Sequence, residues 1–128
     1  MTRVVLVVDD EFGIAELIDA VLTDEGYRVA TAMNGRQGLA MMAKERPDLV
    51  FLDYMMPVMD GADMLRAMTR DPSIDGVPVV LMSSMPEAVV AERCSGYAIF
   101  MRKPFKIAEV TTHAQKLLSQ KDAPQNQP

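Results

Sequence analysis

Five short apolar segments, each followed by a stretch with helical periodicity, limit the possible folds of this chain more than any other feature. They occupy residues 3–8, 27–32, 48–53, 77–83 and 97–101. Continuous runs such as "RVVLVV" and "DLVFLD" are typical of strands buried on both faces of a sheet. Strands that alternate with helices indicate an α/β fold, in which helices cover both faces of a parallel sheet.

The segments between these strands predict helices. In the first of them, apolar residues recur at helical spacing before a glycine that suits a helix end, namely Ile14, Leu17, Ile18, Val21, Leu22 and Gly26. Further helices are predicted over residues 36–45, 62–70, 87–94 and 107–119. Their apolar faces include Ile107 and Leu117 in the last helix. Within "SMPE", Ser84 is predicted to cap the helix at 87–94, with Glu87 completing a capping box.

The size of the chain fits a single domain. Its 128 residues are enough for one hydrophobic core. The five strand–helix units predict a domain over residues 1–119. The remaining segment, 120–128, is polar and carries two prolines, so we expect a disordered tail there.

Composition excludes several classes of function. A net charge of −5 argues against binding to nucleic acid or to an anionic membrane surface. The single cysteine, Cys94, cannot form an internal disulfide, which is compatible with a reducing compartment. The apolar run before the first acidic residues is too short for a signal peptide, and no run approaches the length of a membrane span. We therefore expect a cytoplasmic protein.

Polar side chains capable of chemistry stand at the ends of four of the five predicted strands. Ligands of doubly wound sheets bind beyond the carboxyl ends of the strands. At these ends the sequence has Asp9, Asp10 and Glu11 after the first strand, Asp53 after the third, Ser83 in the fourth, and Lys103 with Pro104 after the fifth. The sequence thus predicts that three aspartates, a hydroxyl group and a lysine meet at one edge of the sheet.

This set of groups suits phosphoryl chemistry. Crowded carboxylates repel one another, and a divalent cation relieves the repulsion. Oxygen ligands without a nearby histidine favour Mg²⁺. An ionised aspartate is a competent nucleophile toward phosphorus. A lysine then adds positive charge at the phosphoryl oxygens, and a hydroxyl group can donate a hydrogen bond to them.

Taken singly, each of these residues has an ordinary structural interpretation. Acidic residues such as Asp9 and Asp10 often open a helix, where the helix dipole stabilises their charge. An aspartate such as Asp53 often begins a turn after a strand. The joint order and spacing across four strand ends is what favours a functional site.

Four motifs carry a resemblance to a known family. "VVDDE", "LDYMMPVMDG", "VPVVLMSSM" and "FMRKPF" resemble the receiver domain of bacterial two-component response regulators, over roughly residues 3–119. The resemblance implies a flavodoxin-like sheet with strand order 2-1-3-4-5. It also implies that Asp53 accepts a phosphoryl group from a phosphohistidine on a sensor histidine kinase or a histidine phosphotransfer protein.

The resemblance also assigns roles to other residues. Asp10, Asp53 and the backbone carbonyl of Met55 would bind Mg²⁺ directly, and Asp9 would assist through water. Lys103 would bind the phosphoryl group, and its bond to Pro104 is expected to be cis. Ser83 and Phe100 match the family's switch hydroxyl and rotating aromatic residue. The protein would phosphorylate itself from a phosphodonor in a Mg²⁺-dependent reaction.

Two methionines bear on how long the phosphorylated state lasts. Met55 and Met85 stand two residues after Asp53 and Ser83, at positions that flank the phosphoryl group in receiver domains. Thioether side chains orient water poorly, so we expect slow autodephosphorylation.

The resemblance implies output through a protein partner. We expect a stand-alone receiver that signals through the face formed by helix 87–94, strand 97–101 and helix 107–119. The run "AVVA" at 88–91 predicts an exposed apolar patch on that face or, nearly as readily, a buried helix end. An alternative is a receiver-like binding module that works without phosphorylation. A hydrolase of the haloacid-dehalogenase kind is disfavoured because Met55 stands where a second aspartate is needed.

Overall fold

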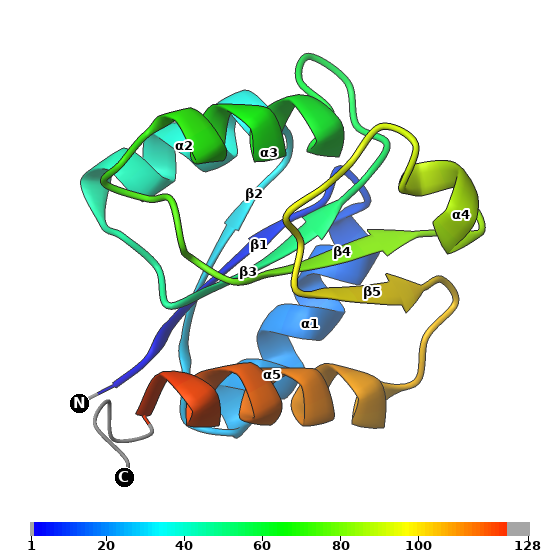
Figure 1. Ribbon diagram of the computed structural model, residues 1–128. Helices are drawn as coiled ribbons and strands as arrows, with labels where there is room; N and C mark the ends of the chain where they lie inside the picture. Colours follow the sequence, from blue (N-terminus) through cyan, green and yellow to red (C-terminus); the bar gives the residue numbers. More distant parts are fainter. Residues whose placement is uncertain (1, 123–128) are drawn as a thin grey trace, which may run out of the picture.

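In the computed structural model of the protein, five parallel strands form one sheet in the order β2-β1-β3-β4-β5 (Figure 1). The structure describes residues 2–122. The strands are β1 (Val4–Val8), β2 (Arg28–Ala32), β3 (Leu49–Asp53), β4 (Val79–Ser83) and β5 (Ile99–Arg102). The helices are α1 (Phe12–Asp24), α2 (Gly35–Lys44), α3 (Gly61–Arg70), α4 (Glu87–Val90) and α5 (Ile107–Asp122). The predicted α/β class, parallel sheet and flavodoxin-like strand order are confirmed.

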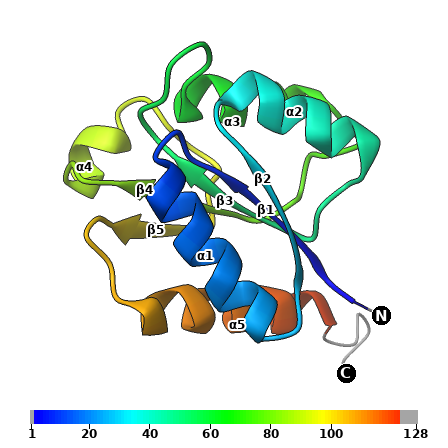
Figure 2. The same cartoon turned by 180° about the vertical axis from the view of Figure 1, so that it is seen from behind.

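The sheet separates two apolar cores. Helices α1 and α5 cover one face, and α2 and α3 cover the other (Figures 1 and 2). Strand β3 is buried throughout and contributes to both cores, because successive side chains of a strand point to opposite faces. Leu49 and Phe51 pack on the α1 and α5 side, whereas Val50 and Leu52 pack on the α2 and α3 side. This explains why β3 reads as a continuous apolar run.

Side-chain caps fix where α2 and α3 begin. Asn34 accepts a hydrogen bond from the backbone N–H of Gln37, and Asp60 accepts one from the backbone N–H of Asp63, each at 2.9 Å. Such caps satisfy backbone donors that have no partner within the helix. Asp60 therefore sets the direction in which the chain leaves the loop after β3.

Helix α4 differs from its prediction. It ends at Val90 rather than at residue 94, and the chain continues in tighter turns, as the bond from the Arg93 N–H to the Val90 carbonyl shows at 3.0 Å. The predicted capping box is wrong, because Pro86 occupies the N-cap position and no side chain caps the helix. Ser84 instead accepts a hydrogen bond at its carbonyl from the Arg102 guanidinium, at 2.8 Å.

The last helix also differs in detail. It continues to Asp122, so the predicted start of a disordered tail at 120 falls within it, and the rest of that tail lies outside the described residues. Ile107 is 53% exposed rather than buried, whereas Val110 in the same turn of α5 is fully buried, so the apolar face of the helix meets the core from Val110 onward. None of the helices within residues 2–122 is at once long and apolar enough to cross a membrane.

Candidate functional site

The polar residues predicted at the strand ends meet at one edge of the sheet. Asp9 follows β1, and Asp53 ends the neighbouring strand β3. Both carboxylates are almost completely buried, at 1% and 5% exposure. The backbone N–H of Asp9 donates to the Ala32 carbonyl at 3.0 Å, which anchors the end of β1 against β2. Two buried acidic side chains thus lie at the carboxyl ends of two inner strands, where water screens their charges poorly.

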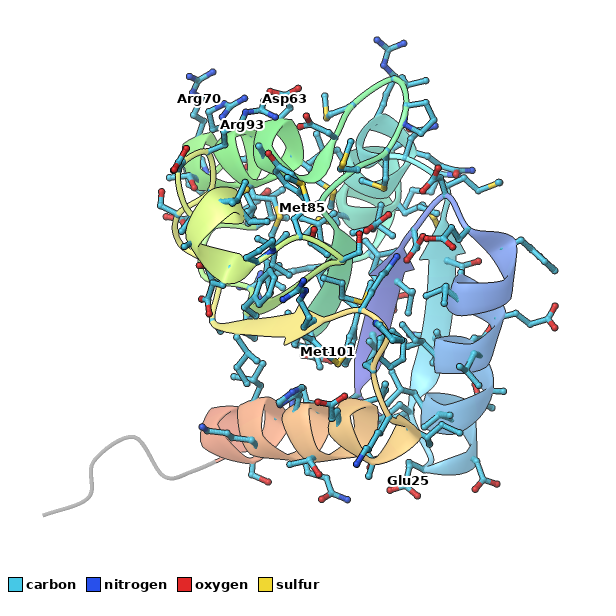
Figure 3. All side chains as sticks on the ribbon, turned by 90° about the vertical axis from the view of Figure 1, so that its right-hand side faces the viewer. Glu25, Asp63, Arg70, Met85, Arg93 and Met101 are labelled. Carbon is cyan, nitrogen blue, oxygen red and sulfur yellow. The ribbon has the colours of Figure 1, made fainter. Side chains whose placement is uncertain are left out.

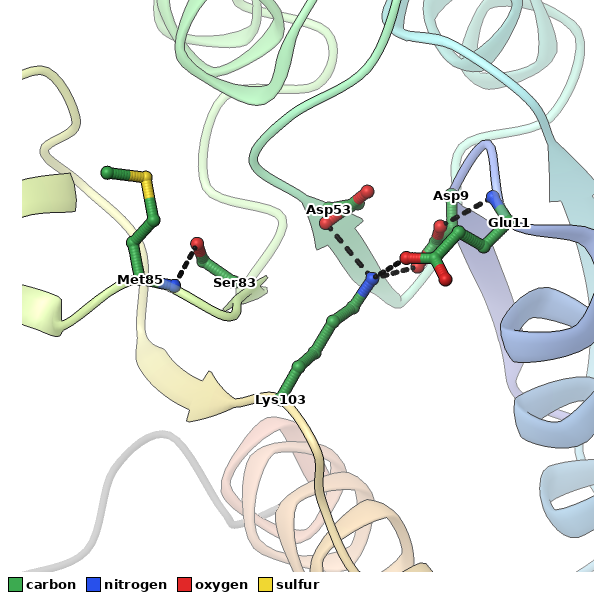
Figure 4. A network of polar contacts seen from close by, with 6 residues as sticks. All are labelled: Asp9, Glu11, Asp53, Ser83, Met85 and Lys103. Atoms are coloured by element: carbon green, nitrogen blue, oxygen red, sulfur yellow. Dashed lines mark hydrogen bonds and ion pairs between the residues drawn. The ribbon is translucent and has the colours of Figure 1, made fainter.

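The ammonium group of Lys103 lies among these carboxylates and offsets part of their charge (Figure 4). Its ammonium nitrogen lies 2.9 Å from Asp9 Oδ2, 3.1 Å from Glu11 Oε1 and 3.2 Å from Asp53 Oδ1. The lysine comes from the loop after β5, and its bond to Pro104 is cis, as expected. One cation therefore contacts three carboxylates from two different strand ends.

Burial and like charge change the acidity of these groups. Desolvation and the nearby charge of Asp9 raise the pKa of Asp53 to about 7, against the opposing effect of Lys103. Desolvation also raises the pKa of Asp9, although hydrogen bonds from the Glu11 N–H and from Lys103 act against it. Burial alone would lower the pKa of Lys103, but its contacts with Asp9 and Asp53 raise it above its ordinary value.

The acidic residues suit a hard divalent cation. Asp9, Asp10 and Asp53 each offer a carboxylate oxygen, and these oxygens lie within 4.8 Å of one another. An all-oxygen set of this charge and spacing matches the preference of Mg²⁺ for a few carboxylates and several waters. The raised pKa values of Asp9 and Asp53 come first from burial and then from neighbouring negative charge, and a bound cation would offset both effects.

Ser83 lies at the same edge, in a hydrogen-bonded turn. Its hydroxyl oxygen accepts a hydrogen bond from the backbone N–H of Met85 at 3.0 Å, and the side chain is buried. The side chain of Met85 points away from Asp53 (Figure 4). Met85 thus contributes its backbone to this turn.

The cleft over the site is open to solvent. Its volume is about 350 Å³, and residues from all four strand ends line it, among them Glu11, Asp53, Met55, Ser83 and Lys103. Met55 lies at its rim with 65% of its surface exposed. This cleft is large enough to admit a phosphoryl group together with part of a donor.

Phe100 lies apart from this cleft. It is half-buried on β5 and packs against the core on the α2 and α3 side, with its ring centroid 6.5 Å from that of Tyr97. Tyr97 in turn donates a hydrogen bond to Glu87 of α4 at 2.9 Å. The predicted switch aromatic therefore belongs to a contact between β5 and α4.

Two residues of the site were not predicted from the sequence. Glu11 contacts Lys103, and the only sequence signal was its place in the acidic run "DDE". Gly61 lies against the backbone of Asp53, so closely that a Cβ atom would stand 2.6 Å from the Asp53 carbonyl oxygen. An Asp-Gly pair such as Asp60-Gly61 is typical of a turn, but nothing in the local sequence indicates this close approach.

Comparison with known proteins decides the family. The family model for the response regulator receiver domain matches residues 5–115. The chain belongs to this family. The acidic pair, Asp53, Ser83 and Lys103 of this receiver domain all lie within the matched segment.

Several relatives cover this receiver domain closely. Sporulation initiation phosphotransferase F of Bacillus subtilis is 37% identical over 121 residues, which make up 92% of this chain and 95% of that protein. The DNA-binding response regulator MtrA of Mycolicibacterium paratuberculosis is 36% identical over 124 residues, or 95% of this chain. Those residues make up 54% of MtrA, so the receiver domain spans about half the length of that relative.

Solved structures agree with this assignment. The receiver domain of a signal transduction histidine kinase from Syntrophus aciditrophicus superposes with a TM-score of 0.87 at 29% identity, covering 99% of this chain and 98% of that one. The chemotaxis response regulator CheY4 of Vibrio cholerae gives a TM-score of 0.79 at 29% identity, covering 91% and 99%. The receiver domain thus shares its whole fold with both proteins.

Proposed function

We propose that this receiver domain accepts a phosphoryl group on Asp53 from a phosphohistidine of a sensor histidine kinase or a histidine phosphotransfer protein. The observation that supports this most is the contact of the Lys103 ammonium group with Asp53 and Asp9, at the floor of an open cleft. It brings a nucleophilic carboxylate and a phosphate-binding cation together where a donor can enter. Membership of the receiver family supports the same function.

In the proposed transfer, a carboxylate oxygen of Asp53 attacks the phosphorus atom of the donor. The bond between phosphorus and the imidazole nitrogen breaks, and the nitrogen keeps the electron pair and then takes up a proton. Lys103 lies close enough to Asp53 to stabilise the negative charge on the transferred oxygens. Ser83 supplies a hydroxyl group that can donate to the same oxygens once it turns from the Met85 N–H.

Asp10 and Asp53, with the Met55 carbonyl and with Asp9 acting through water, would hold Mg²⁺ in this proposal. The clustered carboxylate oxygens support it. When bound, the cation would offset charge on both the nucleophile and the phosphoryl group. A cytoplasmic location is part of the same proposal and agrees with the free, buried thiol of Cys94.

We further propose that the phosphorylated state is read by a protein partner at the face of α4, β5 and α5. Phosphorylation would draw Ser83 toward Asp53 and shift the turn that leads into α4. Phe100 contacts Tyr97, and Tyr97 bonds to Glu87. These two contacts support the proposal because they link β5 to α4. Val89 is 39% exposed on α4 and supplies apolar surface for a partner.

Intact-mass measurement of the purified protein tests the phosphoacceptor directly. The protein is incubated with Mg²⁺ and a small phosphoramidate, and we expect a single phosphoryl adduct that hydroxylamine removes. Asp53→Asn should give no adduct, whereas Asp24→Asn, which changes an exposed aspartate at the end of α1, should react normally. Absence of an adduct on the unaltered protein would instead support a binding module that works without phosphorylation.

A further inference from the structure

A second cleft lies between α3 and the segment that follows α4. It has a volume of about 240 Å³ and shares no residue with the cleft over Asp53. The residues that line it are Ala62, Leu65, Arg66, Thr69, Arg70, Arg93 and Ser95. Three arginines and two hydroxyl-bearing residues thus line this cleft, together with the apolar residues Ala62 and Leu65. Arg70 and Arg93 extend from the same corner of the molecule in Figure 3.

The positive charge in this cleft exceeds its local compensation. Arg66 forms an ion pair with Asp63 one helical turn away, and Arg93 pairs with Asp60 at 3.2 Å. Arg70 has no hydrogen bond or ion pair within the described part of the chain. Three arginines therefore line the cleft, two of them paired with carboxylates, and no acidic residue lines it within the described part of the chain.

Ordinary helix electrostatics account for only part of this arrangement. Arg70 stands in the last turn of α3, where the helix dipole stabilises a cation. However, Arg66 and Arg70 are four residues apart on one helix, a spacing at which like charges repel. Arg93 adds a third positive charge from a different segment. An anion between these groups would remove the repulsion.

The geometry points to a phosphate-bearing anion, and we propose that this cleft binds a small soluble phosphate monoester or diphosphate. Guanidinium groups present pairs of N–H donors that match phosphate oxygens, and the hydroxyl groups of Thr69 and Ser95 can add further donors. A volume of about 240 Å³ is below the range of about 300–1,000 Å³ that is typical of pockets for drug-sized ligands, so it suits a small anion such as a diphosphate better.

The existing contacts leave donors of the arginines available, although Arg93 also donates a hydrogen bond to the Tyr54 hydroxyl at 3.3 Å. The side chains of Arg66 and Arg93 are 47% and 50% exposed in their ion pairs, and exposed pairs of this kind contribute little stability. Exchanging a carboxylate partner for a phosphate oxygen therefore costs little. This site does not depend on the function proposed for Asp53.

Calorimetric titration with pyrophosphate tests the site, at constant ionic strength and with a chelator present to exclude divalent cations. We expect saturable binding that is weakened about tenfold or more in Arg70→Gln and in Arg93→Gln. Arg70→Lys should bind with intermediate affinity, because it keeps the charge but loses the paired donors. Arg36→Gln, an equal change of charge at an exposed position of α2, should leave the affinity unchanged.

Nuclear magnetic resonance of the arginine side chains locates the bound anion. We expect the N–H signals of Arg66, Arg70 and Arg93 to shift along one saturation curve. The proposal is wrong if no saturable binding occurs, or if Arg36→Gln weakens binding as much as Arg70→Gln does. Backbone amide signals are recorded in the same titration. The proposal is also wrong if their shifts centre on Lys103, since the anion would then occupy the cleft over Asp53.

Discussion

The ammonium nitrogen of Lys103 lies 3.2 Å from Asp53 Oδ1, although strand β4 separates the strands that lead to these two residues. The same nitrogen reaches Asp9 after β1, one strand further across the sheet. The long side chain of lysine makes this reach possible, and the buried carboxylates favour it because no other cation pairs with them within residues 2–122. This ion pair is the centre of the site.

Loss of the lysine charge should slow phosphorylation of Asp53. In Lys103→Gln the transferred oxygens lose their nearest cation, and we expect the rate of adduct formation from a phosphoramidate to fall about a hundredfold. The measurement is intact mass as a function of time. Lys106→Gln removes a nearby exposed lysine outside the cleft and should react at the normal rate. A normal rate in Lys103→Gln would contradict the proposed role.

Without divalent cations, Asp53→Asn should stabilise the protein at pH 8 by roughly 1–2 kcal/mol, since it removes a buried and repelled charge. Desolvation and Asp9 raise the pKa of Asp53 to about 7, so the folded state holds its proton more tightly than the unfolded state does. The stability of the unaltered protein should therefore fall as the pH rises from about 4 to about 7.

Denaturant unfolding in a chelating buffer at pH 5 and pH 8 measures this effect. The gain from Asp53→Asn should be larger at pH 8, because at pH 5 the folded protein already carries a neutral Asp53. The exposed Asp75→Asn should change stability by less than about 0.5 kcal/mol at either pH. An equal gain at both pH values would rule out the charge of Asp53 as the cause.

Gly61→Ala should destabilise the fold by about 2–4 kcal/mol. The added Cβ atom would stand 2.6 Å from the Asp53 carbonyl oxygen and 2.9 Å from the Tyr54 Cα atom, and backbone atoms cannot yield cheaply. Gly13→Ala is the matched control, because no atom lies within 4 Å of its added Cβ. Because Gly13 lies in helix α1, Gly13→Ala should raise the free energy of unfolding by up to about 1 kcal/mol. Thermal melts of both variants distinguish steric conflict from a general effect of alanine.

Val58→Gly should stabilise the loop between β3 and α3. Val58 has a φ of +70°, and the Met59 N–H bonds to the Pro57 carbonyl at 2.7 Å across it. A β-branched residue is strained in this conformation, whereas glycine adopts it readily. We expect a gain of about 0.5–1 kcal/mol in unfolding free energy. Val89→Gly, at an exposed position of helix α4, should destabilise instead.

Met55→Asn should shorten the lifetime of the phosphorylated protein. Met55 lines the cleft beside Asp53, and an amide there can orient water for attack on the phosphoryl group. Met85→Glu should have a smaller effect, because the Met85 side chain points away from Asp53 (Figure 4). The decay of the adduct by intact mass gives both rates. The proposal of a methionine-protected phosphoryl group fails if the double variant decays no faster than the unaltered protein.

The elements with strong periodicity were predictable from the sequence. Strand β3 is apolar at four of its five positions and buried at all of them, so "DLVFLD" already indicated a central strand. Helix α4 was not predictable to the same degree. Its apolar residues suggested a helix to residue 94. However, residues 91–93 are exposed, and only Val90 and Cys94 of this segment are buried in the core.

Contacts between distant segments could not be predicted from local patterns. The cleft between α3 and the segment after α4 is lined by three arginines, which stand up to 27 residues apart in the sequence, from Arg66 to Arg93. The hydrogen bond from Arg93 to the Tyr54 hydroxyl at 3.3 Å joins the loop after α4 to the end of β3. Such contacts depend on the path of loops, which residue periodicity does not encode.

The sequence by itself determined the alternation of strands and helices and the residues that end each strand. In a parallel sheet all carboxyl ends share one edge, so the sequence predicts Asp9, Asp53 and Lys103 at that edge, and the strand order implied by the family resemblance brings them near one another. Only the tertiary structure decided that one ammonium group contacts three carboxylates, and that Gly61 presses on the backbone of Asp53. These distances follow from sheet twist, loop path and packing, which arise when distant parts of the chain come together.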